Sequence, residues 1–276
     1  MCKLGYHVSI SGSLDLAFDR AREIGCTCMQ IFLSNPRGWS VKELGEQEVK
    51  SFRAKAKSYG VSPVLAHMPY LPNLASPKEH VYKLSTEVLA GIASRCELLG
   101  VEYLVTHLGS TLGTDKNAAL GRVVEAVRKA CEASPKTCIL RENEAGQKNS
   151  VGSKLEELVQ LYGEIDVKNV GFCADTCHLF AAGYDIRKDE VAEEVVSTLG
   201  EQRIRAIHLN DAKYPVGSGL DRHERIGFGC IGAQGFRALL ARAKIKDKPL
   251  IMETPEVEGS GRIAEMRIAR KLTAEY

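Results

Sequence analysis

The chain has 276 residues and a mass of 30.2 kDa, with 44% hydrophobic and 26% charged residues. These proportions are typical of a globular protein and exclude disordered and collagen-like chains. Lys and Arg number 37 against 35 Asp and Glu, which gives a formal charge of +2 and by itself argues weakly against nucleic-acid binding.

Short β-branched runs alternate with longer, charged stretches of helical period along the whole chain. The predicted strands, in chain order, are Leu4–Val8, Cys28–Leu33, Val61–Ala66, Tyr103–Thr106, Thr137–Arg141, Val170–Ala174, Ile204–Leu209 and Leu250–Met252. The clearest amphipathic helices are predicted at Leu14–Ile24, Val41–Ser58 and Val81–Leu99, and a glycine follows each of them. Such alternation of strands and helices is typical of parallel βαβ units.

Eight such units close into a (β/α)8 barrel whose functional site lies at the C-terminal ends of the strands. A doubly wound open sheet is the alternative, but the turn after the first strand, Ser9–Ser13, lacks the Gly-x-Gly-x-x-Gly pattern. No Pro-, Gly- or Ser-rich linker divides the sequence. We therefore predict an α/β fold in which residues 1–276 form a single TIM-barrel domain with parallel strands and a metal site at the C-terminal face.

The nine cysteines include no Cys-x-x-Cys pair, and the sequence starts without the apolar stretch of a secretion signal. No apolar run approaches the roughly 18 residues that a membrane span needs. We expect a cytoplasmic protein with reduced thiols and no contact with a membrane.

Histidines and acids gather where the predicted strands end. Five of the 7 histidines lie there, namely His67, His107, His178, His208 and His223. The carboxylates of this zone are Glu142, Asp175, Asp211, Asp221 and Glu253. Each residue taken alone has a simpler interpretation, such as a hydrogen-bonded structural histidine or a helix cap. Packed together without cations, however, these groups would repel and desolvate one another at a large cost.

Imidazole and carboxylate ligands without thiolates suit Zn²⁺, with Mn²⁺ or Fe as possible substitutes. Asp175 and His178 are three residues apart, and Asp221 and His223 are two apart, which favours short chelates. Cys177 is an alternative thiolate ligand. The ligands are too many for one tetrahedral ion and suit two or three metals, with Glu142 bridging a pair. Such clusters are typical of displacement at phosphorus or at a carbonyl, and their concentrated positive charge favours phosphorus, which overturns the argument from net charge.

Three stretches of sequence carry a family resemblance: Gly171–His178 (GFCADTCH), Ile207–Ala212 (IHLNDA) and Asp221–Gly227 (DRHERIG). The stretches His67–Leu71 (HMPYL) and Glu142–Gln147 (ENEAGQ) also fit. With these motifs the chain resembles, from His7 to Pro255, the endonuclease IV family of metal-dependent apurinic/apyrimidinic (AP) endonucleases of base-excision repair.

The resemblance implies three zinc ions. The first ion is expected at His67, His107 and Glu142, the second at Glu142, Asp175, His208 and Glu253, and the third at His178, Asp221 and His223. It also implies hydrolysis of the phosphodiester 5′ to an abasic site in double-stranded DNA, leaving a 3′-hydroxyl and a 5′-deoxyribose phosphate, with Glu142 as the catalytic bridge. A monomer is expected.

Two loops match the family's DNA-reading loops and suggest Arg37, Tyr70 and Leu71 as DNA-binding residues. The physics fits, because an abasic nucleotide has no base to unstack and leaves the duplex at little cost. The alternatives are a solvated charge for Arg37 and loop packing for Tyr70 and Leu71.

Three residues depart from the family pattern. Arg141 stands where an apolar residue is expected, Glu144 where Thr is expected, and Phe228 where Glu is usual. Glu144 places an extra negative charge near the metals, so we expect effects on rate and substrate preference.

Two other functions stay open. A metal-dependent sugar isomerase on the same barrel would often carry a catalytic Lys at a strand end, and only Lys213, in a loop, stands out here. A non-catalytic binder of abasic DNA would have no use for a full set of activating metals.

Overall fold

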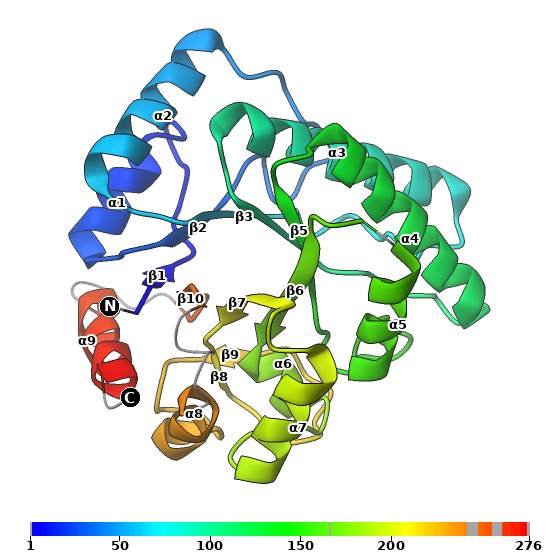
Figure 1. Cartoon of the computed structure of the whole chain (residues 1–276), viewed down its shortest axis with the longest axis vertical. Helices are drawn as coiled ribbons and strands as arrows, with labels where there is room; N and C mark the ends of the chain where they lie inside the picture. Colours follow the sequence, from blue (N-terminus) through cyan, green and yellow to red (C-terminus); the bar gives the residue numbers. More distant parts are fainter. Residues whose placement is uncertain (1, 166, 242–247, 256–260, 275–276) are drawn as a thin grey trace.

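Eight parallel strands form one closed sheet in the computed structural model, which describes residues 2–165, 167–241, 248–255 and 261–274. The strands are β1 (Leu4–Tyr6), β2 (Met29–Phe32), β3 (Val64–His67), β4 (Tyr103–Thr106), β5 (Cys138–Glu142), β6 (Val170–Asp175), β7 (Ile204–His208) and β10 (Leu250–Met252). Their order in the sheet is β1-β10-β7-β6-β5-β4-β3-β2. A parallel bridge between His7 and Gln30 joins the two ends. The predicted TIM barrel of parallel strands is therefore confirmed (Figure 1).

Helices surround the strands (Figure 1). They are α1 (Leu16–Ile24), α2 (Glu46–Tyr59), α3 (Glu79–Leu99), α4 (Lys116–Ala133), α5 (Leu155–Ile165), α6 (Thr176–Ala181), α7 (Asp189–Leu199), α8 (Gly232–Leu240) and α9 (Gly261–Ala274). Their apolar stripes pack on the outer faces of the strands, as α3 does with Leu89, Ile92 and Cys96. No helix of the described residues has the length and apolar character that crossing a bilayer requires.

The predicted elements differ from the observed ones mainly at their starts. The helix predicted from Val41 begins only at Glu46, because Gly45 is extended and the preceding Val41 and Leu44 pack on the core from a loop. The strand predicted from Val61 begins at Val64, since Pro63 has no N–H to donate to the ladder.

Two short elements at the C-terminal face were not predicted. Helix α6 follows β6 directly, and strands β8 (Asp211–Ala212) and β9 (His223–Glu224) form an antiparallel hairpin. Both are too short to show a periodic pattern.

Two layers of side chains fill the barrel toward the C-terminal ends of its strands. The layer further from these ends is apolar and consists of Cys28, Leu65, Val105, Leu140, Cys173, Ala206 and Ile251. Gly5 completes it on β1, where a Cβ atom would lie 1.9 Å from the Cys28 carbonyl oxygen. Side chains alternate along a strand, so the residues two positions further on also face inward. These residues form a polar layer of His7, Gln30, His67, His107, Glu142, Asp175, His208 and Glu253.

Candidate metal centre

The structure brings all nine sequence-predicted metal ligands together at the mouth of the barrel. Among the groups whose ligand atoms all lie within 4.8 Å of one another, three match the expected ligand sets: His67, His107 and Glu142; Glu142, Asp175, His208 and Glu253; and His178, Asp221 and His223. His67, His208 and Glu253 also form such a group. Six of the nine residues belong to the polar layer, and the other three come from α6 and the β8–β9 hairpin. Cys177 also lies within this distance of Asp175 and His223, although its thiol donates to the Arg222 carbonyl oxygen at 3.6 Å.

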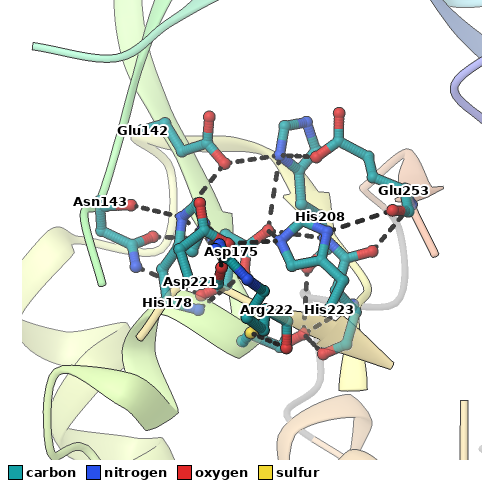
Figure 2. Close-up of polar contacts among 12 residues, drawn as sticks. Glu142, Asn143, Asp175, His178, His208, Asp221, Arg222, His223 and Glu253 are labelled. Atoms are coloured by element: carbon teal, nitrogen blue, oxygen red, sulfur yellow. Dashed lines mark hydrogen bonds and ion pairs between the residues drawn. The ribbon is translucent and has the colours of Figure 1, made fainter. Parts of the chain in front are cut away.

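Glu142 is fully buried and its two oxygens face different groups. Oε2 lies 3.2 Å from His67 Nε2 and 3.4 Å from His107 Nε2. Oε1 lies 2.7 Å from His208 Nδ1. Figure 2 draws this contact as a dashed line. One carboxylate therefore touches both the first and the second group, which is the arrangement that a bridging ligand requires.

The second group is held in register by the sheet. Asp175 on β6 and His208 on β7 are direct neighbours in the ladder. His208 Nδ1 lies 3.2 Å from Glu253 Oε2 and 3.7 Å from Asp175 Oδ2. The Gln30 amide donates to Glu253 Oε1, so its own oxygen accepts from His208 Nε2 at 2.8 Å. This hydrogen bond leaves the Nδ1 lone pair of His208 directed at the carboxylates.

The third group contains two buried imidazole nitrogens without a hydrogen-bond partner, His178 Nε2 and His223 Nε2. They lie 3.1 and 3.3 Å from the same oxygen, Asp221 Oδ1. Their Nδ1 atoms face the backbone oxygens of Asn143 and Glu253, which can only accept, so Nδ1 carries the proton. Two lone pairs converging on a carboxylate need a positive charge between them, and a divalent cation fits this requirement.

The pKa shifts of the clustered histidines and acids also fit a site for divalent cations. Burial alone would lower the pKa of His107, but the Glu142 and Glu144 carboxylates outweigh it and raise the pKa to about 10. Burial also opposes protonation of His223, whose pKa nevertheless rises to about 9 because of Asp221 and Asp175. Burial disfavours the charged form of Glu142, yet His208 and His107 hold its pKa well below the usual value. The cluster thus binds protons that a divalent cation would displace.

Neighbouring residues that the sequence did not single out hold Asp175 in place. The Asn143 oxygen accepts from Asp175 N at 2.7 Å, and the Asn210 amide donates to Asp175 Oδ2 at 2.7 Å. Asp175 Oδ1 accepts from His178 N, so the same side chain also caps α6. His7 and Gln30 were also absent from the predicted site residues. The feature of the sequence that could have indicated them is their position two residues after Gly5 and Cys28, which face inward.

Asp211 lies three residues beyond the end of β7, at the start of β8, and joins none of these groups in the described part of the chain. Its carboxylate instead accepts hydrogen bonds from backbone N–H groups of the loop after β9, including Gly227 and Gly229 at 3.0 Å and Ile231 at 2.9 Å. Gly229 approaches so closely that a Cβ atom would lie 2.5 Å from the carboxylate. Asp211 therefore fixes the loop that continues from the hairpin.

The three departures from the family pattern lie in different environments. Arg141 is fully buried on the outer side of β5. Glu144 is buried beside the metal centre, where its Oε1 lies 3.0 Å from His107 Nδ1. Phe228 is exposed, with the Arg225 guanidinium 4.3 Å from the centre of its ring.

The three predicted DNA-binding residues lie on two loops at the rim. Tyr70 is 66% exposed, Leu71 is 43% exposed and Arg37 is exposed as well. The loops are joined by a hydrogen bond from Tyr70 N to the Pro36 oxygen at 3.1 Å. Tyr70 lines the cavity above the metal centre, of about 220 Å³, together with His67 and Glu253. A second hollow of about 380 Å³, lined by Tyr70, Leu71 and Glu144, adjoins it.

Comparisons with known proteins identify the family. Residues 18–274 match the family model of the xylose isomerase-like TIM barrel, AP_endonuc_2. The chain is 48% identical to a probable endonuclease 4 of Methanoculleus marisnigri, over 97% of this chain and 98% of the relative. It is 33% identical to endonuclease IV of Thermus thermophilus, with a TM-score of 0.89, covering 99% of this chain and all of that structure.

A D-tagatose 3-epimerase-like protein is also similar in structure, with a TM-score of 0.74 over 98% of this chain and 97% of that one. At 21% identity this likeness shows the shared fold alone. The identity to the endonucleases is higher and covers nearly the whole sequence. The chain belongs to the endonuclease IV family of AP endonucleases.

Proposed function

We propose that this protein hydrolyses the phosphodiester 5′ to an abasic site in double-stranded DNA, leaving a 3′-hydroxyl and a 5′-deoxyribose phosphate, as a step of base-excision repair. The observation that carries the proposal is the set of three ligand groups at the barrel mouth, the first two of which share Glu142. Family membership supports the choice of DNA as the substrate.

Three ions would occupy the three groups, with Zn²⁺ as the expected metal and Mn²⁺ or Fe as possible substitutes. His67, His107 and Glu142 would hold the first, Glu142, Asp175, His208 and Glu253 the second, and His178, Asp221 and His223 the third. When bound, such ions supply an activated water and neutralise the charge that develops on the departing oxygen.

The protein's own residues orient this chemistry. Glu142 links the first two groups from a fully buried position, in which four imidazoles lie within 3.5 Å of its carboxylate oxygens. Asn143 and Asn210 hold the Asp175 carboxylate between the second and third groups. Tyr70 lines the cavity and is exposed at the rim, so substrate is expected to enter from its side.

Arg37, Tyr70 and Leu71 are proposed to contact the DNA around the abasic site. Two exposed apolar side chains beside a cationic one, above a cavity that bound cations would make attractive to phosphate, suit a duplex whose abasic nucleotide is turned out of the stack. We further propose a cytoplasmic monomer in which residues 1–276 act as one domain. The nine cysteines form no disulfide, which supports a reducing compartment.

The test is incision of an end-labelled duplex that carries one tetrahydrofuran abasic analogue, with and without prior chelation. This analogue cannot undergo β-elimination, so a product can arise only by hydrolysis. We expect cutting on the 5′ side that chelation abolishes and added Zn²⁺ restores.

Glu142→Gln should lose incision and part of the bound metal, since an amide cannot bridge two cations. The matched control is Glu43→Gln, which removes one charge from an exposed loop residue. Cutting that resists chelation would overturn the metal mechanism, and a fully active Glu142→Gln protein would overturn the role of the bridge.

A further inference from the structure

Each of the five imidazoles in the metal centre has one nitrogen directed at the carboxylates and one directed at a supporting group. In four of them the supporting group is a neutral carbonyl oxygen: Met68 O for His67, Asn143 O for His178, Glu253 O for His223 and Gln30 Oε1 for His208, at 2.7 to 3.1 Å. His107 differs, because its Nδ1 lies 3.0 Å from a carboxylate oxygen, Glu144 Oε1.

Glu144 is well placed for this contact. It follows β5 two residues after Glu142, and its backbone N–H donates to the Gly152 oxygen at 3.1 Å, which anchors the segment. Its side chain is buried and reaches across to the end of β4, where His107 lies. The opposite nitrogen, His107 Nε2, lies 3.4 Å from Glu142 Oε2.

The contact with Glu144 decides which nitrogen of His107 carries the proton. A carboxylate only accepts, so His107 donates through Nδ1–H and turns the Nε2 lone pair toward Glu142. Carboxylate–histidine–metal triads fix the tautomer and the ring orientation and make the imidazole a stronger ligand than a carbonyl support does. The low exposure of Glu144 strengthens the effect, because little water screens the interaction.

We propose that Glu144 is a positioning residue for His107, and that it strengthens the binding of a divalent cation by His67, His107 and Glu142. Besides the expected effect on substrate preference, the charge of Glu144 thus has a role in metal binding, because it is directed at the His107 imidazole. This inference rests on the proposed metal centre but not on DNA cleavage.

Metal binding by the purified whole chain tests it. Metal-free protein is titrated with Zn²⁺ alone in competition with a chromophoric chelator, and the visible spectrum of the Co²⁺-loaded protein is recorded. Glu144→Gln keeps the size and an acceptor oxygen but removes the charge. Glu144→Thr introduces the residue expected in the family at this position, so the fold accepts it.

Both variants should bind one of their ions about 10- to 100-fold more weakly than the unaltered chain, with a changed Co²⁺ spectrum. Glu43→Gln, the exposed charge control, should match the unaltered chain. Equal Zn²⁺ affinity and equal spectra in both Glu144 variants would overturn the proposal. Failure of the unaltered chain to bind Zn²⁺ would instead overturn the metal centre itself.

Discussion

Replacing Arg141 by Leu should stabilise the protein. The Arg141 guanidinium is fully buried between β5 and α5, and among the described residues no carboxylate lies within ion-pair distance of it. Nη1 donates to the Leu158 oxygen at a long 3.5 Å, whereas Nε and Nη2 have no partner. Partial compensation comes from the rings of Phe172 and Tyr162, whose centres lie 4.7 and 5.3 Å from the guanidinium carbon.

The magnitude follows from these contacts. Burial lowers the pKa of Arg141 from its usual 12.5 to about 10. One pKa unit corresponds to about 1.36 kcal/mol, so keeping the charge in this position costs roughly 3 kcal/mol at neutral pH. The aromatic contacts return about 1–2 kcal/mol. Leu keeps the apolar packing without the charge, and we expect the free energy of unfolding to rise by about 1–2 kcal/mol.

Urea unfolding with chelator present in every sample measures this change free of metal linkage. The matched control is Arg203→Leu, because the Arg203 guanidinium lies 4.5 Å from the same Tyr162 ring but the residue is exposed. That control should change the free energy of unfolding by no more than about 0.5 kcal/mol. If Arg141→Leu is instead less stable by more than about 1 kcal/mol, the ring contacts outweigh the desolvation and the reasoning is wrong.

Three further outcomes are expected. Asp211→Asn should lower the free energy of unfolding by about 2–3 kcal/mol in urea titrations, because several backbone N–H groups lose a charged acceptor. In chelator-treated protein the pKa values of His107 and His223 lie above the unfolded value of 6.5. The stability that these two protonated histidines give the fold is therefore complete below pH 6.5 and is lost as the pH rises through about 9 to 10. The midpoint of thermal unfolding should fall over this range, and it should fall less with Zn²⁺ bound. Arg37→Ala and Tyr70→Ala should each weaken the binding of abasic duplex by about 1–3 kcal/mol in gel-shift titrations, with unchanged metal content.

Each of these has a clear contrary result. An Asp211→Asn protein as stable as the unaltered chain would mean that the loop does not depend on the carboxylate. A metal-free protein whose unfolding midpoint rises between pH 6.5 and 9 would reverse the sign of the histidine contribution. Unchanged affinity for abasic duplex in both rim variants would leave Arg37 and Tyr70 as loop-packing residues.

The barrel could be predicted from sequence because every strand carries its own signal, a short β-branched run followed by a helical period. The pool of candidate ligands could be predicted because strand ends converge on one face. Their division into three groups was implied by the family resemblance, and the observed groups contain the expected residues. His7 and Gln30 could have been found by counting two residues on from the inward-facing Gly5 and Cys28.

The remaining features depend on contacts between distant segments. No local pattern indicates that Glu144 meets His107 across two strands, or that Arg141 is enclosed between β5 and α5 without a partner. The hairpin β8–β9 and helix α6 could not be predicted because elements of two to six residues have too few positions for a period.

The division of the candidate ligands between the barrel and its attachments has a mechanical consequence. Two groups are built from neighbouring strands, whose separation of about 4.8 Å is set by backbone hydrogen bonding and not by loop sequence. The third group comes from α6 and the β8–β9 hairpin, and the loop that follows this hairpin is held by the single carboxylate of Asp211. Local opening of such attached segments needs less free energy than opening a closed sheet. The first two ligand groups are therefore held more rigidly than the third. Mild denaturant should release the ion of the third group while the ions of the first two groups stay bound.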